Sequence, residues 1–192
     1  MGATLPRRVV VGITGASGIP YAKDLLETLR RAGGVEVHLV ATDGARRVAA
    51  DELGTTLEEL SALADVVHPN KDIGASIASG SFRTLGMVVV PCSATTLSKV
   101  AYGVCDNLVT RAAYVHIKER RPLVLVPREA PLPLPTLEAM VKAAQAGATI
   151  LPASPGFYTR PQSIDDLLGF VTQRVLDLLG IEADRAPRWK EA

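Results

Sequence analysis

The chain is poor in the residues that define several large classes of protein. Its two cysteines, Cys92 and Cys105, form neither a CxxC pair nor a disulfide framework. The three histidines show no metal-binding spacing, so we expect no metal site. With a net charge of +1, the chain lacks the excess of basic residues that would bind nucleic acid or an anionic membrane. It also has no apolar run of about 18 residues and no signal-peptide pattern, which favours a cytoplasmic protein without membrane spans.

Apolar sequence, by contrast, is plentiful. Hydrophobic residues make up 47% and charged residues 21%, which is enough for a sizeable core and argues against disorder. The 192 residues suit one domain, and no repeat, linker or low-complexity segment divides them. We therefore expect residues 1–192 to form a single domain.

Short β-branched runs predict a buried parallel sheet. Four of them, and a shorter fifth, end in small or turn-forming residues; they cover residues 7–15, 35–44, 86–93, 122–129 and 147–155. Because they do not alternate with polar residues, they are typical of strands covered on both faces. Helical stretches lie between them, at residues 19–32, 43–53, 93–102, 106–118 and 135–146. This alternation predicts a doubly wound, three-layer α/β domain, in which His38 lies inside a strand as a core residue.

The last helix has the clearest boundaries. Ser163 is the expected N-cap, with Asp166 three residues later, and Gly180 ends the helix. Arg174 falls on the edge of its apolar stripe, where an arginine either snorkels or points into a site.

The segment "GITGASG", residues 12–18, follows the first strand and opens the first helix. Its glycines let the backbone approach a ligand, and the helix N-terminus favours an anion. The second strand ends in Thr42 and lacks the acid of a dinucleotide fingerprint, so the loop is interpreted as a phosphate or flavin site. A tight turn without a ligand is the alternative. Ser17 is either the N-cap of the helix or a hydroxyl that faces the ligand.

Hydroxyl groups crowd the end of the strand at 86–93. Ser93, Thr95 and Thr96 suit a phosphate or a flavin edge, although N-capping alone would need only one of them. Cys92 is interpreted as a small buried residue, because no base accompanies it.

The helix at 106–118 carries two cations on one face, with Asp106 as the expected N-cap. Arg111 and Lys118 are seven residues apart, about 10 Å along the axis. They either bind an anionic ligand at two points or lay their aliphatic stems along the helix surface with the charged groups in water.

The stretch "LVLVPREAPLP", residues 123–133, runs from a buried strand directly into Arg128 and Glu129. An arginine binds phosphate through paired hydrogen bonds, and a glutamate transfers protons. Pro127 and Pro131 restrict the backbone on either side. The alternative is an ordinary solvated turn with two surface charges.

Together these segments resemble the flavin prenyltransferases, which make prenylated FMN for UbiD-type decarboxylases. The resemblance runs in order from about residue 8 to Trp189, through "GITGASG", "IASGSF", "PCSATTLSKVA", "DNLVTRAA", "KERRPLVLVPRE", "GATILPASPGFYTRPQ" and "DLLGFVTQRVLDLLG". It implies a flavodoxin-like or Rossmann-like αβα sandwich. It also implies a metal-independent enzyme that joins a dimethylallyl group from dimethylallyl phosphate to N5 and C6 of reduced FMN. Members form large homo-oligomers, often dodecamers, with sites at subunit junctions.

Site residues follow from the same resemblance. FMN would be bound by Gly15, Ala16, Ser17, Thr42, Ser93, Ala94, Thr95, Thr96 and Arg111. The prenyl phosphate would be bound by Lys118, Arg128, Tyr158 and Arg174. Glu129 would be the acid–base residue, with Ser17 close to N5, and Tyr158 or Arg174 could come from a neighbouring chain.

The sequence departs from the family pattern at Thr136, where a histidine is common, and at Tyr114, where an aspartate is usual. Two other functions stay open. One is an FMN-dependent cysteine decarboxylase of the same fold, although its substrate segment and histidine are not found. The other is a non-catalytic FMN-binding subunit of a decarboxylase, which would have no need of Glu129.

Overall fold

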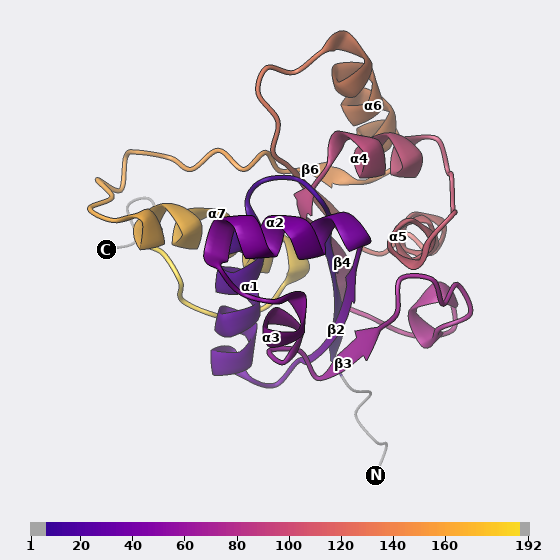
Figure 1. Cartoon of the computed structure of the whole chain (residues 1–192), viewed down its shortest axis with the longest axis horizontal. Helices are drawn as coiled ribbons and strands as arrows, with labels where there is room; N and C mark the ends of the chain where they lie inside the picture. The colour runs from indigo at the N-terminus through magenta and orange to yellow at the C-terminus, as the bar shows by residue number, and fades with distance from the viewer. Residues whose placement is uncertain (1–6, 189–192) are drawn as a thin grey trace.

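The computed structural model describes residues 7–188, and the last position of the family resemblance, Trp189, lies outside the described residues. Six strands form one parallel sheet in the order β3-β2-β1-β4-β5-β6 (Figure 1). Their bounds are Arg8–Ile13 (β1), Glu36–Ala41 (β2), Val66–His68 (β3), Gly86–Cys92 (β4), Leu123–Pro127 (β5) and Thr149–Ile150 (β6). The helices are Ile19–Ala32 (α1), Asp43–Leu53 (α2), Leu57–Ser61 (α3), Ala94–Ala101 (α4), Leu108–Lys118 (α5), Leu134–Gln145 (α6) and Ile164–Leu179 (α7), with a short 3-10 helix at Ser76–Ala78.

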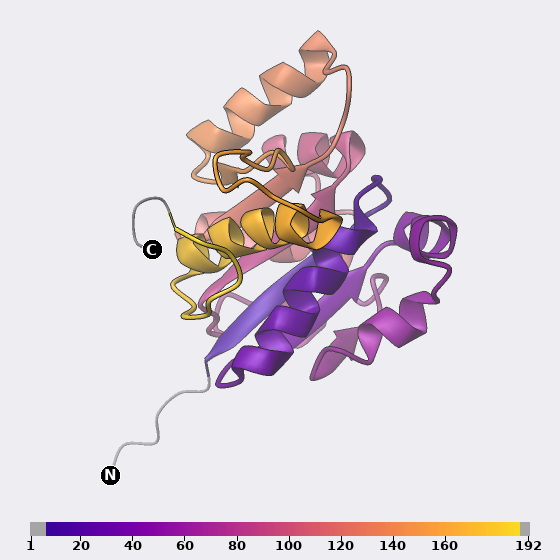
Figure 2. The ribbon, with the colours of Figure 1, turned by 90° about the vertical axis from the view of Figure 1, so that its left-hand side faces the viewer.

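The strands separate two apolar cores, which gives three layers. On β1, Val9 and Val11 face the core that α1, α2, α3 and α7 cover, while Val10 faces the core beneath α4, α5 and α6. Figure 2 shows α1 and α7 side by side across the first face. Because both faces are covered, the strands are apolar throughout, as the runs in the sequence predict. The predicted doubly wound αβα sandwich is confirmed.

The strand order reverses between β1 and β4. From β1 the chain builds outward through β2 to β3, and then returns to place β4 on the other side of β1. In doubly wound sheets the crevice at such a reversal, outside the carboxyl ends of the strands, is where ligands bind. The loops after β1 and β4 therefore flank the expected binding position.

Helix boundaries agree with the sequence expectation except at α5. Its N-cap is Asn107, whose Oδ1 accepts a hydrogen bond from the Thr110 N–H at 3.0 Å. Asp106 instead forms an ion pair with Lys99, with 2.5 Å between Nζ and Oδ2. The expected cap was therefore wrong by one residue, because the aspartate has a cationic partner on α4. At α7 the expected capping box of Ser163 and Asp166 is present.

Two further expectations about buried residues are confirmed. His38 is buried in β2, and its ring nitrogens contact Glu36 Oε1 at 2.6 Å and His68 Nε2 at 2.9 Å. Cys92 is buried as well, and this burial raises the pKa of its thiol to about 12. A thiol that stays protonated is a packing residue and not a nucleophile.

Candidate active site

The loops after β1 and β4 are joined by one buried threonine. Thr14 Oγ1 donates to the Pro91 carbonyl at 2.7 Å and accepts from the Ser93 N–H at 2.8 Å. The Thr14 side chain is fully buried, so its hydroxyl has no competing contact with water. This residue fixes the two loops to each other across the reversal point of the sheet. The sequence reasoning missed Thr14, although a polar residue directly after a buried strand was visible.

The loops after β1 and β2 touch through their backbones. A Cβ atom added to Gly15 would lie 3.0 Å from the Cα of Gly44. That distance is too short for a side chain, so the glycines permit this approach. The close contact thus brings Thr42, just before Gly44, to the same edge of the sheet as Ser17. The sequence predicts that the glycines let the backbone approach a ligand; at Gly15 the close approach in the structure is to the backbone of Gly44.

The N-terminus of α1 already carries a carboxylate. Glu52, at the end of α2, accepts hydrogen bonds from the Gly18 N–H at 2.9 Å and the Ile19 N–H at 2.8 Å. Gly18, with φ of 118°, is the N-cap residue of α1, and as a glycine it has no side chain to accept a capping hydrogen bond. Ser17 therefore does not cap α1, which leaves its exposed hydroxyl available to a ligand. Because Glu52 occupies these amides, a ligand phosphate would be bound by other donors of the site.

The remaining hydroxyl and cationic groups have different surroundings. Ser93 is the N-cap of α4, where its Oγ accepts from the Thr96 N–H at 3.2 Å, so the capping alternative holds for this residue. Thr95 is exposed, and neither its hydroxyl nor the half-buried Arg111 guanidinium has a hydrogen-bond partner among residues 7–188. These free donors lie on α4 and α5, which follow β4.

The end of β5 reaches the turn before α1. Arg128 Nε donates to the Ser17 carbonyl at 3.1 Å, and the arginine stem packs against Gly18. This contact leaves the terminal nitrogens of the guanidinium for a ligand. Glu129 is exposed, and its carboxylate accepts only the Ala130 N–H, at 3.2 Å, within the described part of the chain. Arg128 thus lies beside Ser17, and Glu129 is the next residue along the chain.

Tyr158 and Arg174 lie together at a cavity whose lining includes neither Arg128 nor Glu129. This cavity has a volume of about 200 Å³ and lies between α7 and the segment that follows it. The Tyr158 ring meets the Phe170 ring edge to face, with 5.7 Å between centroids. Arg174 is exposed and pairs with Asp177, at 3.2 Å between Nη1 and Oδ2.

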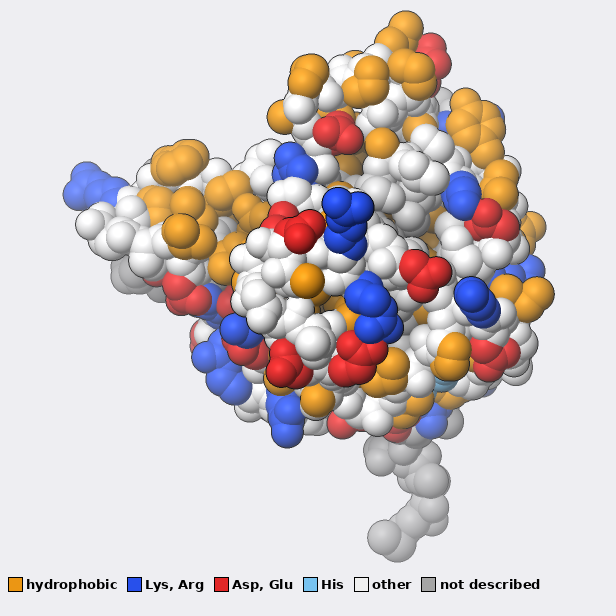
Figure 3. Space-filling model, in the orientation of Figure 1, with side chains coloured by type: hydrophobic (Ala, Val, Ile, Leu, Met, Phe, Trp, Pro, Cys, Tyr) orange, Lys and Arg blue, Asp and Glu red, His pale blue; other side chains and the backbone are white. Residues whose placement is uncertain are grey.

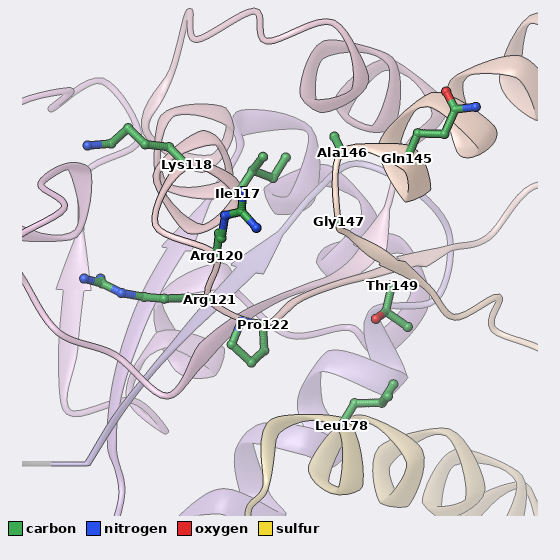
Figure 4. A pocket seen from close by; sticks show the side chains of 10 residues that line it. All are labelled: Ile117, Lys118, Arg120, Arg121, Pro122, Gln145, Ala146, Gly147, Thr149 and Leu178. Carbon is green, nitrogen blue, oxygen red and sulfur yellow. The ribbon is translucent and has the colours of Figure 1, made fainter.

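Lys118 lies at the opposite end of the sheet. It ends α5 shortly before β5 begins, whereas Arg128 follows directly after β5. The five residues of β5, at about 3.3 Å each, put roughly 16 Å between these edges. Figure 4 shows Lys118 at a pocket with Arg120 and Thr149, its ammonium directed away from Thr149. Lys118 pairs there with Glu119, at 2.7 Å. Within one chain, Lys118 and Arg128 do not meet.

Comparisons with known proteins agree on one family. The model of the family described as Flavoprotein matches residues 3–176. A flavin prenyltransferase UbiX from Deinococcus radiodurans is 58% identical over 186 residues, which cover 97% of this chain and 95% of that protein. The Escherichia coli K12 flavin prenyltransferase UbiX is 50% identical over 188 residues, with coverage of 97% and 100%. The chain belongs to the UbiX-like flavin prenyltransferase family. The resemblance in the sequence, and the expectation of a flavoprotein prenyltransferase, are confirmed.

Solved structures of relatives support the same conclusion. A UbiX structure in complex with FMN and dimethylallyl pyrophosphate has a TM-score of 0.94 and 42% identity, and covers 98% of this chain and 100% of that one. A dodecameric FMN-dependent UbiX-like decarboxylase from E. coli O157:H7 has a TM-score of 0.92 and 44% identity, with coverage of 95% and 99%. The FMN-dependent cysteine decarboxylase TvaF, at 17% identity and a TM-score of 0.65, shares the fold alone.

No helix within residues 7–188 is long and apolar enough to cross a membrane. The same residues contain no cluster of three potential metal-ligating side chains.

Proposed function

We propose that the protein joins the dimethylallyl group of dimethylallyl phosphate to N5 and C6 of reduced FMN. Phosphate is released, and the prenylated FMN serves a UbiD-type decarboxylase. The observation that carries the proposal is the position of Arg128 and Glu129 beside Ser17, with 3.1 Å between Arg128 Nε and the Ser17 carbonyl oxygen. This contact supports the proposal because Arg128 is suited to bind a phosphate and Glu129 to transfer a proton, and both follow β5 next to the turn that the glycine loop forms.

The residues around the sheet reversal fit FMN. Three hydroxyls, of Ser17, Thr42 and Thr95, and the Arg111 guanidinium have no hydrogen-bond partners among the described residues. Such donors suit a phosphate and the polar edge of a flavin. In this proposal FMN is bound by Gly15, Ala16, Ser17, Thr42, Ser93, Ala94, Thr95, Thr96 and Arg111. Bound reduced FMN supplies the electron-rich N5 and C6 atoms.

Arg128, Arg174, Lys118 and Tyr158 bind the donor phosphate in this proposal. The positive charges of the two arginines and of Lys118 stabilise the charge that develops on the leaving group as its C–O bond breaks. Glu129 gives a proton to the leaving phosphate, or takes one from the flavin later. Its exposed carboxylate, which accepts a hydrogen bond from the Ala130 N–H, is suited to either role.

A homo-oligomer, in the form of a dodecamer, completes the site in this proposal. The length of β5 puts roughly 16 Å between the sheet edge near Lys118 and the edge near Arg128, so a neighbouring chain must supply Lys118 for the phosphate cluster to form. Figure 3 shows hydrophobic side chains gathered over α6 and over the segment before α7. Leu134 and Val141 on α6 are 66% and 57% exposed, and Phe157 before α7 is 73% exposed, which is typical of surfaces that associate. We further propose that residues 1–192 form one domain that acts in the cytoplasm.

The reaction is tested by mass spectrometry. The protein is incubated with reduced FMN and dimethylallyl phosphate, and the molecular mass of the released flavin is measured. We expect a flavin heavier by one dimethylallyl group, together with inorganic phosphate. An unmodified flavin, with the donor intact, would contradict the proposal.

The shared site is tested by mixing inactive variants. Lys118→Ala and Glu129→Gln chains are co-expressed with different tags, and mixed oligomers are purified. Because a site between two chains can then contain an intact Lys118 and an intact Glu129, we expect partial recovery of activity. Mixed oligomers as inactive as either parent variant would refute a shared site.

A decarboxylase is the second candidate, because the E. coli O157:H7 relative is described as a UbiX-like decarboxylase. Release of CO2 from a carboxylic acid substrate, measured beside flavin modification in the same sample, separates the two. CO2 release with an unmodified flavin would favour the second candidate.

A further inference from the structure

The end of α5 carries an ion pair that lies against a glycine of another segment. Lys118 Nζ is 2.7 Å from Glu119 Oε1. A Cβ atom added to Gly80, in the segment between β3 and β4, would overlap the Glu119 carboxylate and lie 3.0 Å from Lys118 Nζ. The pair therefore has room at this position because Gly80 has no side chain.

Arg121 holds the backbone around Gly80. Its Nη1 donates to the Phe82 carbonyl at 2.6 Å, and its Nη2 donates to the Gly80 carbonyl. One planar guanidinium thus binds two carbonyls at once, a geometry that a lysine ammonium does not reproduce. Figure 4 shows the Lys118 and Arg121 side chains extending in the same direction, away from Thr149. The arginine that fixes Gly80 is therefore close in the chain to the lysine that packs against it.

A further contact joins the same segment to α5. Thr84 Oγ1 lies 2.8 Å from Nε2 of the buried His116. Burial lowers the pKa of His116 to about 4, so its ring is neutral at neutral pH. Since its Nδ1 donates to the Ala112 carbonyl at 2.8 Å, its Nε2 accepts from the Thr84 hydroxyl. Residues 80–84 are thus attached at several points to α5 and to the turn that follows it.

The Phe82 ring fixes this segment to the sheet. It meets the His38 ring edge to face, with 5.0 Å between centroids, and the Arg8 guanidinium lies 4.5 Å from its centroid. Arg8 is on β1 and His38 is on β2, so the segment is held between α5 and the sheet. It forms a firm support for a side chain that packs on it.

The support limits the freedom of the Lys118 ammonium. A lysine side chain loses much rotamer freedom when it binds a ligand, and contacts that order it beforehand reduce this cost. The hydrogen bond from Lys118 holds the pKa of the Glu119 carboxyl below its ordinary value, so the pair stays ionised at neutral pH. Glu119 engages only part of the donor capacity of the ammonium, which leaves N–H groups for a phosphate.

We propose that Gly80 and Arg121 are positioning residues for Lys118. Arg121 fixes the segment, and Gly80 gives the Lys118–Glu119 pair its place, so that the ammonium is oriented before it meets the donor phosphate of a neighbouring chain. This inference rests on the proposed function and deepens it, because it names residues that act on the donor without contacting it.

The first test is Gly80→Ala. The atoms that its Cβ would meet are the ends of two flexible side chains, so the variant should keep its fold while the ion pair moves away. The protein is loaded with oxidised FMN, so that dimethylallyl phosphate binds without being consumed, and calorimetry measures its Kd. We expect the donor Kd to rise between about threefold and tenfold, the upper limit being one lost charge-assisted contact. The FMN Kd and the Tm should not change.

Gly74→Ala is the matched control. Gly74 lies in the same segment, and a Cβ there would make only an ordinary contact, 3.5 Å from Asp72 Oδ1. Its donor Kd should equal that of the parent. A donor Kd for Gly80→Ala within twofold of the parent, or an equal rise in Gly74→Ala, would overturn the inference.

The second test is a double-mutant cycle with Lys118→Ala. If Gly80 acts through Lys118, the effect of Gly80→Ala on the donor Kd should disappear when Lys118 is already alanine. Arg121→Lys cannot bind both carbonyls in the same way, so it should also raise the donor Kd, and only while Lys118 is present. A merely structural role would raise the donor Kd equally in both backgrounds, and that result would refute positioning.

The mass of the released flavin separates this inference from the proposed reaction. If Gly80→Ala weakens donor binding only where Lys118 is present, but the parent forms no prenylated FMN, the positioning role stands and the proposed reaction fails. If the parent forms prenylated FMN and Gly80→Ala binds the donor as well as the parent does, the positioning role fails and the proposed reaction stands.

Discussion

Replacing Thr14 by valine tests whether one hydroxyl holds the two site loops together. Valine keeps the shape of the buried side chain and removes its hydroxyl. Two hydrogen bonds are lost, at 2.7 Å to the Pro91 carbonyl and at 2.8 Å from the Ser93 N–H. The Pro91 carbonyl keeps the Thr14 N–H as a donor at 3.3 Å, so only the Ser93 N–H loses its partner.

The magnitude follows from these contacts. Each hydrogen bond contributes about 1 kcal/mol net, and an unpaired, partly buried N–H costs about 1 kcal/mol more. Thr14→Val should therefore lower the free energy of unfolding by roughly 2–3 kcal/mol. Because the loops after β1 and β4 also flank the FMN position, the Kd for FMN should rise several-fold in protein that remains folded.

The assay is urea unfolding followed by circular dichroism, with FMN titration on the folded variant. Thr14→Ser is the matched control, since it keeps the hydroxyl and loses only a methyl group; its loss should stay near 1 kcal/mol. If Thr14→Val unfolds at the same urea concentration as the parent and binds FMN equally well, the hydroxyl does not join the loops and the reasoning is wrong.

Three further predictions concern the site. Gly15→Val should abolish FMN binding, because its Cβ would lie 3.0 Å from the Gly44 Cα and force the two loops apart. The measurement is FMN titration on a variant with a native circular dichroism spectrum, and an unchanged Kd would contradict the prediction. Glu129→Gln should bind FMN normally while product formation falls by about 10² or more, the scale of a lost general acid–base; a variant as active as the parent removes Glu129 from the mechanism. Arg174→Ala should raise the KM for dimethylallyl phosphate about tenfold with FMN affinity nearly unchanged, as one lost charge-assisted contact implies; equal losses for both ligands would make Arg174 structural.

The strands that lie deepest were predictable because burial on both faces leaves an uninterrupted apolar run. That signal fails at β3, whose three residues are only partly buried, with Val67 52% exposed at the sheet edge. The short α3 was missed as well, although its capping box, Thr56 with Glu59, is written in the sequence. At the start of α5 two residues that can cap a helix, Asp106 and Asn107, are adjacent in the sequence. Asn107 is the cap because Asp106 pairs with Lys99 on α4, a contact that the local sequence does not show.

That the candidate residues at strand ends lie at one edge was predictable for a topological reason, since parallel strands bring their carboxyl ends together. Residues that reach the site from helix ends give no such signal. Glu52, at the end of α2, lies 34 residues from the Gly18 amide it binds. This contact depends on how α1 and α2 pack, which no local pattern records.

The separation of Lys118 and Arg128 by the length of β5 has a consequence for how activity depends on enzyme concentration. If the donor phosphate needs both residues, a dissociated chain can carry FMN and still turn over nothing. Specific activity should then fall when the enzyme is diluted below the dissociation constant of its oligomer, and recover on concentration. Turnover then depends on the assembly, so substitutions on the exposed face of α6 that weaken association would lower kcat per chain at low protein concentration and leave it unchanged at high concentration.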